Sequence, residues 1–311
     1  MRAFHEIMRR DVVTIYFIKY FGGDFSGSIC AVEEIIMSAE AKVASHYGKG
    51  GLEQKIFTAL KNAGINMDHP TVEDLAPVDE FHVGGLESTK ELAAQMELQP
   101  GMRLLDVGSG IGGPARYFAA HHGCRVTGVD LTEEFIQVAN SLTRLAKLEA
   151  LADFQQASAL QMPFDPATFD RASMIHVGMN IAKKDALFRE VRRVLKPGAL
   201  FAVFDLVRTA PGPLSYPLPW AATEETSFVS TANDYRDALQ RAGFQPERER
   251  GRRDYAIEFT EQRNALLAQD GPPRLGLQLL IGEKAPLVAQ NLLTMMKQGT
   301  LEPTEFISRA A

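Results

Sequence analysis

The spacing of three glycines is the feature of this sequence that most directly suggests chemistry. Gly108, Gly110 and Gly113 fit the pattern G-x-G-x-x-G directly after a predicted strand at residues 103–107, and Pro114 is suited to open a helix. Glycine permits a tight turn and lets a ligand approach where a Cβ would clash. This order of strand, glycine turn and helix start is typical of a nucleotide-cofactor site, although the spacing alone occurs in several folds.

An acidic residue in this strand bears on the kind of cofactor. Asp106 stands two residues before the first glycine, where a pyrophosphate would meet negative charge. A carboxylate there suits a ligand with an ammonium or sulfonium group, so the loop favours S-adenosylmethionine, with Gly108 and Gly110 against its methionine portion. The bare glycine spacing and Asp130 leave a nicotinamide-dependent dehydrogenase as an alternative.

Asp130 ends the predicted second strand, twenty residues after Gly110. A carboxylate at such a strand end can accept hydrogen bonds from both ribose hydroxyls, and Leu131 would then lie against the adenine. Helix capping is the alternative role for Asp130. We disfavour it because Thr132 is itself suited to cap the helix that begins at Glu133.

Three residues are candidates for the catalytic site. His176 follows the predicted fourth strand, near where the transferred group and its acceptor should meet, and a histidine can act as a general base near neutral pH. His82 and Tyr47 come from the region before the glycine loop. Each of the three could instead be a packed structural side chain.

Other residues could shape an acceptor pocket after the fifth predicted strand. Asp205 could bind a substrate amine or cap a turn. Tyr216 and Trp220 lie in or beside residues 210–219, a loop with four prolines, and could wall the pocket or simply pack.

Apolar segments alternate with helical patterns along the middle of the chain. The predicted strands are residues 103–107, 124–129, 153–157, 169–175 and 200–204, and a helix with one apolar face is predicted at residues 184–195. Strands that alternate with helices form right-handed βαβ units and a parallel sheet covered on both faces. The predicted fold class is α/β with a Rossmann-like, mostly parallel sheet.

The region before this alternation is predicted to be helical. Residues 37–98 form a helical cap in this interpretation, with helices at 52–63 and 87–98. Residues 1–36 are predicted to be an N-terminal extension, because Met37 begins a stretch that is typical of an N-terminus. An ordinary packed helix is the alternative for the extension.

Composition argues against several classes of function. The 33 basic and 39 acidic residues give a net charge of -6, which disfavours a nucleic-acid partner. The apolar residues 12–21 are too few to span a membrane. The two cysteines, Cys30 and Cys124, fit a reducing, cytoplasmic setting, and no metal-binding cluster is evident. The predicted partner is a small molecule, and a homodimer is left open.

Several segments resemble those of class I S-adenosylmethionine-dependent methyltransferases. They are LLDVGSGIGG, the acid in VTGVDLT, LQMPFDPATFD and ALFREVRRVLKPGALFAV. The resemblance covers residues 99–243 and implies a seven-stranded sheet whose last strand is antiparallel, with the cofactor over the carboxyl ends of the strands. It also implies that Ser158 and Ala159 lie beside the adenine, with serine where the family usually has an acid. Residues 99–311 would form the methyltransferase domain.

The region YG…FHVGG and a long insertion near the end are loosely similar to small-molecule enzymes such as the sarcosine/dimethylglycine N-methyltransferases. The resemblance implies methyl transfer to a small molecule, most simply an amine. A carbon or oxygen of a prenyl, quinol or other natural-product acceptor is the alternative. A non-catalytic cofactor-binding module is a further alternative, and the long insertion argues against it.

Residues 255–301 are predicted to be a helical insertion before the last strand. They separate residues 247–254 from 306–309, the candidates for the last two strands, by more than a hairpin needs. Apolar residues of the insertion, among them Leu280 and Met295, need a partner, which the mouth of the sheet and the helical cap would supply. The insertion is therefore predicted to be a lid that excludes water and shapes the acceptor pocket.

Overall fold

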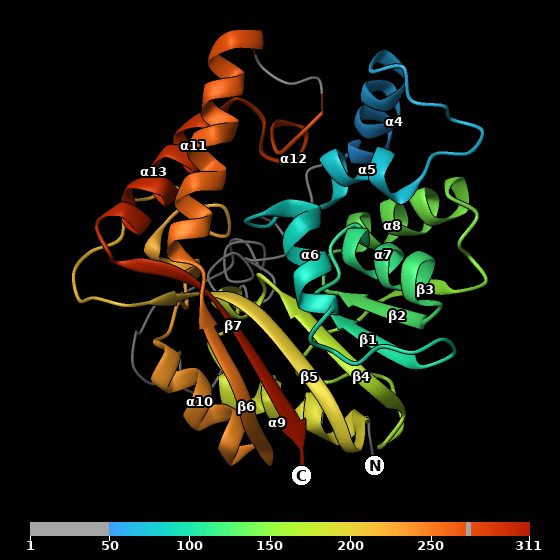
Figure 1. The fold of residues 1–311 in the computed structure, drawn as a ribbon, viewed down its shortest axis with the longest axis vertical. Coiled ribbons are helices and arrows are strands. Elements are labelled where there is room, and N and C mark those ends of the chain that lie inside the picture. Colours follow the sequence, from blue (N-terminus) through green and yellow to red (C-terminus); the bar gives the residue numbers. More distant parts are fainter. Residues whose placement is uncertain (1–49, 272–274) are drawn as a thin grey trace, which may run out of the picture. The chain divides into compact units, whose positions relative to one another are not determined.

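The computed structural model describes residues 50–271 and 275–311, which contain a seven-stranded sheet (Figure 1). The strand order is β3-β2-β1-β4-β5-β7-β6, and β7 runs antiparallel to both of its neighbours while the other pairings are parallel. The strands span Arg103–Val107 (β1), Arg125–Asp130 (β2), Ala152–Gln156 (β3), Phe169–Ile175 (β4), Leu195–Arg208 (β5), Phe244–Gly251 (β6) and Leu301–Ala310 (β7). The predicted Rossmann-like sheet with an antiparallel last strand is confirmed.

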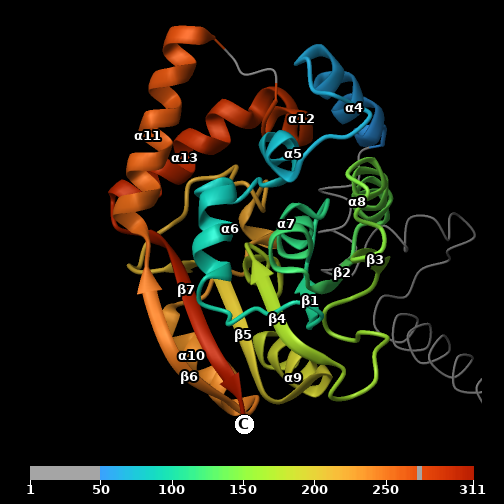
Figure 2. The ribbon, with the colours of Figure 1, turned by 45° about the vertical axis from the view of Figure 1, so that its right-hand side comes forward.

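Helices pack on both faces of this sheet (Figure 2). Phe118 of α7, Ile136 of α8 and Leu92 of α6 bury their side chains against one face. Phe188 of α9 and Leu239 of α10 pack against the other face. Because both faces are covered, the central strands read as nearly continuous apolar segments. These helices span Gly85–Ala93 (α6), Gly113–His122 (α7), Glu133–Leu145 (α8), Lys184–Val194 (α9) and Ala232–Arg241 (α10).

Two further groups of helices lie before the sheet and between its last two strands. They span Leu52–Asn62 (α4), Val72–Asp79 (α5), Arg253–Asp270 (α11), Gln278–Ile281 (α12) and Ala285–Lys297 (α13), with 3₁₀ turns at Gly178–Asn180 (η2), Glu224–Thr226 (η3) and Gly282–Lys284 (η4). Leu279 and Leu280 of α12 pack in one apolar cluster with Ile56 and Leu60 of α4 and with Ile111 of the glycine loop. The two groups therefore meet beside the glycine loop.

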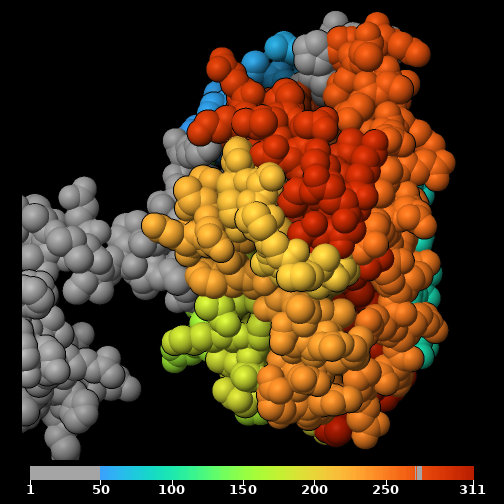
Figure 3. Space-filling model, turned by 90° about the vertical axis from the view of Figure 1, so that its left-hand side faces the viewer, coloured from blue at the N-terminus to red at the C-terminus, as the bar shows by residue number. Residues whose placement is uncertain are grey.

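Helix α13 packs against the loop that follows β5. Leu292, Met295 and Met296 share an apolar cluster with Leu218 and Trp220. The space-filling view shows this contact, with α13 in red beside the loop in gold (Figure 3). The insertion thus covers part of the proline-containing loop.

Some element boundaries differ from the sequence predictions. Helix α5 was missed, because Pro77 stands inside it; a capping box between Thr71 and Asp74 defines its start. Strand β5 was predicted too short, since its pairing with β7 continues to Arg208. Strand β7 begins at Leu301 rather than 306. The charged Glu305 can be buried in this strand because it pairs with Arg250 of β6 and with Arg252, the N-cap residue of α11.

Among the described residues, no helix is long and apolar enough to cross a membrane. The predicted extension, residues 1–36, lies outside the part of the chain that the structure describes. The division into extension, helical cap and methyltransferase domain stays a prediction.

Candidate functional site

The glycine loop joins the carboxyl end of β1 to the start of α7. Gly108 has a φ of +69°, and a Cβ built on it would lie 2.4 Å from the Val177 side chain. Gly110 has a φ of +54°, and a Cβ built on it would meet no protein atom within 4 Å. The amide of Ser109 donates to the Val129 carbonyl at 2.9 Å, which ties the loop to β2. Packing therefore requires glycine at position 108, whereas Gly110 borders open space in a cavity.

Asp106 lies in this cavity with only 2% of its surface exposed. Its Oδ1 accepts a hydrogen bond from the Ser173 hydroxyl at 2.8 Å, and its Oδ2 has no partner among the described residues. Burial raises the pKa of Asp106 to about 7, although the bond from Ser173 opposes this. A buried, unpartnered carboxylate oxygen is costly unless a ligand donates to it, so the position fits a cationic ligand group.

Asp130 ends β2 and faces the same cavity. Its Oδ2 accepts from the amide of Gly110 at 3.0 Å and its Oδ1 accepts from the amide of Thr132 at 2.8 Å. Thr132 occupies the N-cap position of α8, but its side chain makes no capping hydrogen bond. The argument that Thr132 spares Asp130 from capping is therefore wrong, because Asp130 itself satisfies an amide at this helix start. Hydrogen bonding from the Thr132 hydroxyl and the Leu131 amide also opposes the effect of burial on the Asp130 pKa.

Of the three residues predicted beside the adenine, two line the cavity and one does not. Leu131 and Ala159 line the cavity together with Ala157. Ser158 is not among the described lining residues, and its hydroxyl accepts a hydrogen bond from the Leu160 amide at 3.1 Å. The backbone around Ala159 thus borders the cavity, whereas the Ser158 side chain serves a local turn.

The cavity itself has a volume of about 220 Å³ and is lined by the glycine loop, by strand ends and by helices from both ends of the chain. Most of its remaining lining residues are apolar: Phe81, Ile111, Phe135, Ile175, Val177, Met179, Ile181, Pro219, Trp220, Leu277 and Leu280. A cavity with apolar walls and few polar groups is typical of a small-molecule site.

His176 follows β4 and lines the cavity. Its φ of +54° is uncommon for a residue with a side chain and places the ring beside Phe204, with the ring centroids 5.0 Å apart. Nε2 of His176 has no hydrogen-bond partner among the described residues. Burial, with a smaller contribution from His82, lowers the pKa of His176 well below its ordinary value. The ring is therefore neutral at physiological pH and can accept a proton.

His82 lines the same cavity from the loop between α5 and α6. The centroids of its ring and the His176 ring lie 5.8 Å apart in an edge-to-face arrangement. The structure thus brings together two of the three predicted catalytic candidates. The third, Tyr47, lies outside the described residues.

The residues predicted to shape an acceptor pocket separate into two groups. Trp220 lines the cavity, and its Nε1 donates to the Ser227 hydroxyl at 3.0 Å. Tyr216 packs on the apolar cluster under α13 instead. Asp205 is fully buried and accepts hydrogen bonds from the Gly178 amide and the Tyr235 hydroxyl. Its role is therefore to fasten the segment after β4.

Sequence reasoning missed a buried ion pair that docks the helical cap on the glycine loop. Arg116 of α7 is fully buried and donates to Asp79 at 2.7 Å and to the Ile111 carbonyl at 2.7 Å. A Cβ on Gly113 would lie 2.4 Å from the Asp79 carbonyl oxygen. The third glycine of the motif thus serves the approach of the cap. Arg116 in the first turn of α7, two residues after Pro114, was the available signal.

The predicted lid contributes two described residues to the cavity. Leu277 and Leu280, in and just before α12, line it together with the glycine loop. Met295 lies instead in the apolar cluster with Trp220 and has 4% of its surface exposed. Among the described residues there is no group of three or more His, Cys, Asp or Glu side chains that could hold a metal ion.

Comparison with known proteins identifies the central part of the chain. The family model for the methyltransferase domain matches residues 105–203. The matched range contains the glycine loop, Asp130 and His176, but not the helices before β1 or after β6. Residues 105–203 are thus a methyltransferase domain, as the sequence motifs predicted.

Among curated proteins, a sterol methyltransferase-like protein 3 of Botryococcus braunii is 42% identical over 114 residues, which is 37% of this chain and 29% of that protein. The aligned part spans about a third of the length of the curated relatives it matches. These alignments therefore cover only part of this chain and part of each relative.

Solved structures share the fold over a longer range. The geranyl diphosphate C-methyltransferase of Streptomyces coelicolor has a TM-score of 0.67 at 15% identity, over 88% of this chain and 99% of that one. A sarcosine dimethylglycine methyltransferase of Galdieria sulphuraria has a TM-score of 0.60 at 17% identity, over 75% of this chain and 93% of that one. At these identities, both similarities show a shared fold and nothing further.

Proposed function

We propose that this chain, which carries an S-adenosylmethionine-dependent methyltransferase domain at residues 105–203, methylates a small-molecule acceptor in the cavity beside the glycine loop. The main support for the proposal is the lining of this cavity. A single cavity is lined by Gly110 and Asp130 as well as by His176 and apolar side chains. Cofactor and acceptor would therefore meet in one cavity.

The residues around the glycine loop fit S-adenosylmethionine. The unpartnered Oδ2 of Asp106 would accept a hydrogen bond from the ammonium group of the cofactor, and the Asp130 carboxylate, which lines the same cavity, would accept hydrogen bonds from the ribose hydroxyls. The open space at Gly110 leaves room for the ligand, and Leu131 and Ala159 would contact the adenine. When bound, the cofactor supplies a methyl group activated by its sulfonium.

The acceptor that the geometry supports best is a small molecule with an apolar body. Phe81, Trp220 and Leu280 line the cavity from three separate parts of the chain, and apolar surface favours an apolar ligand. The likeness to the sterol methyltransferase-like protein supports the same choice. The acceptor atom would then be a carbon or an oxygen of such a molecule.

An amine, which the sequence resemblance implied, is the second candidate. The neutral, unpartnered imidazole of His176 favours it, because an amine must lose a proton on methylation. The likeness to the sarcosine dimethylglycine methyltransferase fold is consistent with this candidate. A test of the function therefore needs acceptors of both classes.

For methyl transfer, the protein would have to position the acceptor and accept a proton from it. Methyl transfer is an in-line displacement, so the cavity must align the acceptor and exclude water. Trp220 and Leu280 would exclude water, and His176 would accept the proton that the acceptor atom loses as its new bond to the methyl carbon forms.

The proposal is tested in two stages. Calorimetry should detect binding of S-adenosylmethionine and no binding of NAD, which would separate it from a dehydrogenase. Transfer of a labelled methyl group is then measured against matched panels of amines and of sterol, prenyl and phenolic acceptors. His176→Asn should abolish transfer, whereas His122→Asn should not, since His122 also has an unpartnered Nε2 but lies outside the cavity. Cofactor binding without transfer to any panel member would refute the catalytic proposal.

A further inference from the structure

Both ring nitrogens of His82 are engaged within the protein. Nδ1 lies 3.2 Å from the Val83 carbonyl oxygen, and Nε2 lies 2.6 Å from Oε2 of Glu80. The Val83 carbonyl can only accept, so Nδ1 donates to it. Nε2 is occupied by Glu80, and neither nitrogen therefore keeps a lone pair for a substrate. His82 is thus unsuited to act as a base, although it lines the cavity.

Burial makes these contacts necessary. The His82 side chain is 6% exposed and the Glu80 side chain 1% exposed, and Thr89, which is fully buried, donates to the same Oε2 at 2.8 Å. A buried polar group that loses its partner costs free energy. The three side chains therefore hold the ring of His82 in one orientation.

The fixed His82 ring is one of two rings that confine His176. His82 meets His176 edge to face, and Phe204 packs against both, with ring centroids 5.0 Å from His176 and 6.2 Å from His82. No hydrogen bond holds Nε2 of His176 among the described residues. Ring packing is therefore what orients His176.

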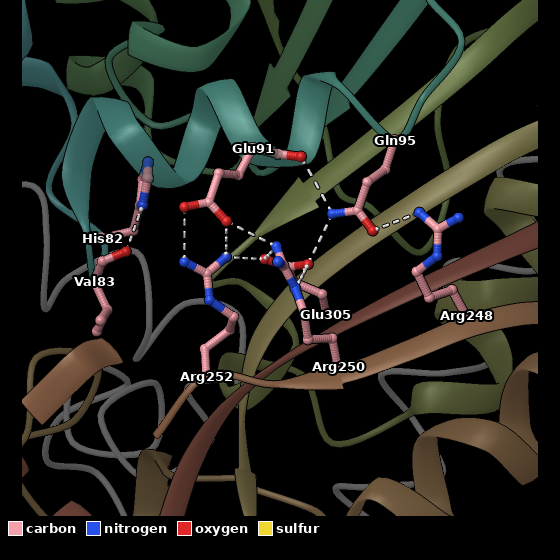
Figure 4. Close-up of polar contacts among 8 residues, drawn as sticks. All are labelled: His82, Val83, Glu91, Gln95, Arg248, Arg250, Arg252 and Glu305. Atoms are coloured by element: carbon pink, nitrogen blue, oxygen red, sulfur yellow. Dashed lines mark hydrogen bonds and ion pairs between the residues drawn. The ribbon is translucent and has the colours of Figure 1, made fainter. Parts of the chain in front are cut away.

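Helix α6, which carries Thr89, is also held by polar contacts of Glu91 and Gln95 with arginines of the chain's C-terminal part (Figure 4). Arg252 donates to Glu91 at 2.7 Å and to Glu305 at 2.6 Å, and Arg250 bonds both acids as well. This cluster joins α6 to β6 and β7. Glu91 therefore offers a matched control, since its loss would loosen the same helix without touching His82.

We propose that Glu80 is a positioning residue for methyl transfer, which rests on the proposed function. Glu80 fixes the His82 ring, and the rings of His82 and Phe204 then orient His176 toward the cavity. Of the two histidines, only His176 takes up a proton from the acceptor. Glu80 touches neither cofactor nor acceptor in this scheme and acts through His82.

The test combines a spectroscopic signature with kinetics on the full-length chain. Proton NMR of ¹⁵N-labelled protein should show a strongly downfield imidazole N–H from the short contact between His82 and Glu80. This signal should vanish in Glu80→Ala and His82→Asn and persist in Glu91→Gln. With an acceptor from the panel, Glu80→Ala should lower kcat on the order of 100-fold, since misplacing a reacting group has effects of that size. Cofactor affinity should change by less than about threefold, and Glu91→Gln should leave kcat within about threefold.

A signal that persists in Glu80→Ala, or equal losses of kcat in Glu80→Ala and Glu91→Gln, would overturn the inference. If Glu80→Ala does not fold, Glu80→Gln serves instead, because its amide can still hydrogen-bond the ring. Its signal should move upfield and its kcat should lie below that of the wild type; a variant equal to the wild type in both respects would refute the positioning role. Failure of the proposed function would appear separately, as absence of cofactor binding or of transfer to every panel member by the wild type, while the NMR signal would still report on the contact between Glu80 and His82.

Discussion

Two carboxylates at the ends of neighbouring strands dominate the cofactor side of the cavity. Asp106 and Asp130 both line it, and burial raises the pKa of each. Their surroundings differ, because backbone amides, among them those of Gly110 and Thr132, donate to Asp130, while Ser173 is the described hydrogen-bond partner of Asp106. The same residue type is thus suited to different ligand groups, hydroxyls at Asp130 and a cation at Asp106.

Replacing Asp130 by alanine should weaken S-adenosylmethionine binding by about 1–3 kcal/mol, the cost of leaving buried hydroxyls unpaired. Calorimetry on the folded variant measures this. Asp153→Ala is the control, since Asp153 bonds Thr127 on the neighbouring strand outside the cavity. Equal affinities of the wild type and Asp130→Ala would contradict the assignment.

Cofactor affinity should depend on pH through Asp106. Its pKa is raised to about 7, and the ammonium group of the ligand prefers the ionised carboxylate. Affinity should therefore be highest above pH 7 and fall as the pH drops below it, approaching about tenfold per unit. Calorimetry from about pH 5.5 to about pH 8 checks this. Asp106→Asn should bind weakly with a flatter profile, and an unchanging wild-type affinity would exclude this role.

Gly110→Val should abolish cofactor binding, because a branched side chain would fill the space open to the ligand and resist a φ of +54°. Gly198→Val separates the loss of ligand space from the backbone strain. Gly198 has a φ of +79° and equally open surroundings, but it lies away from the cavity. If both variants bind S-adenosylmethionine like the wild type, the loop is not the cofactor site.

Among the elements, those that follow a repeating pattern could be predicted and those fixed by distant partners could not. The local periodicity of apolar residues predicts the alternation of strands and helices from β1 to β5. The first half of β7 depends on arginines that neutralise Glu305, and α5 contains Pro77. For the site, Asp130 and the glycines could be recognised from the sequence. Glu80 could not, because its importance depends on three-dimensional contacts with His82 and Thr89.

The insertion provides a prediction about the acceptor. Leu280→Ala should weaken acceptor binding or change acceptor preference, since Leu280 lines the cavity, while cofactor affinity stays nearly unchanged. Acceptor KM and calorimetry with the cofactor measure the two effects. Met295, a buried residue of α13, packs in the apolar cluster with Trp220, so its substitution would report on stability as well. Leu287, 53% exposed on α13, is the control. Equal losses of both affinities would refute a lid specific for the acceptor.

In the molecule as a whole, the cofactor and acceptor walls come from different parts of the chain. Residues 105–203 match the family model and supply the glycine loop and Asp130. Phe81 and His82 come from before this range, and Trp220, Leu277 and Leu280 come from after it. Resemblance in the central range therefore supports the cofactor more directly than it supports any acceptor. The two solved structures named above share this fold although their names give different acceptors, so the fold by itself does not select an acceptor.

The last prediction concerns the predicted extension. Deleting residues 1–36 should leave the fold and cofactor affinity largely unchanged, because the described part of the cavity lining begins at Asp79 and the sheet begins at Arg103. The helices from α4 onward have their own attachments, since the amides of Gly50 and Leu52 donate to Glu134 at 2.8 Å. Thermal unfolding and calorimetry of the truncated chain check this, with Glu134→Gln in the full-length chain as a probe of the attachment. Loss of soluble protein, or a fall in cofactor affinity on truncation alone, would show that residues 1–36 are part of the functional unit.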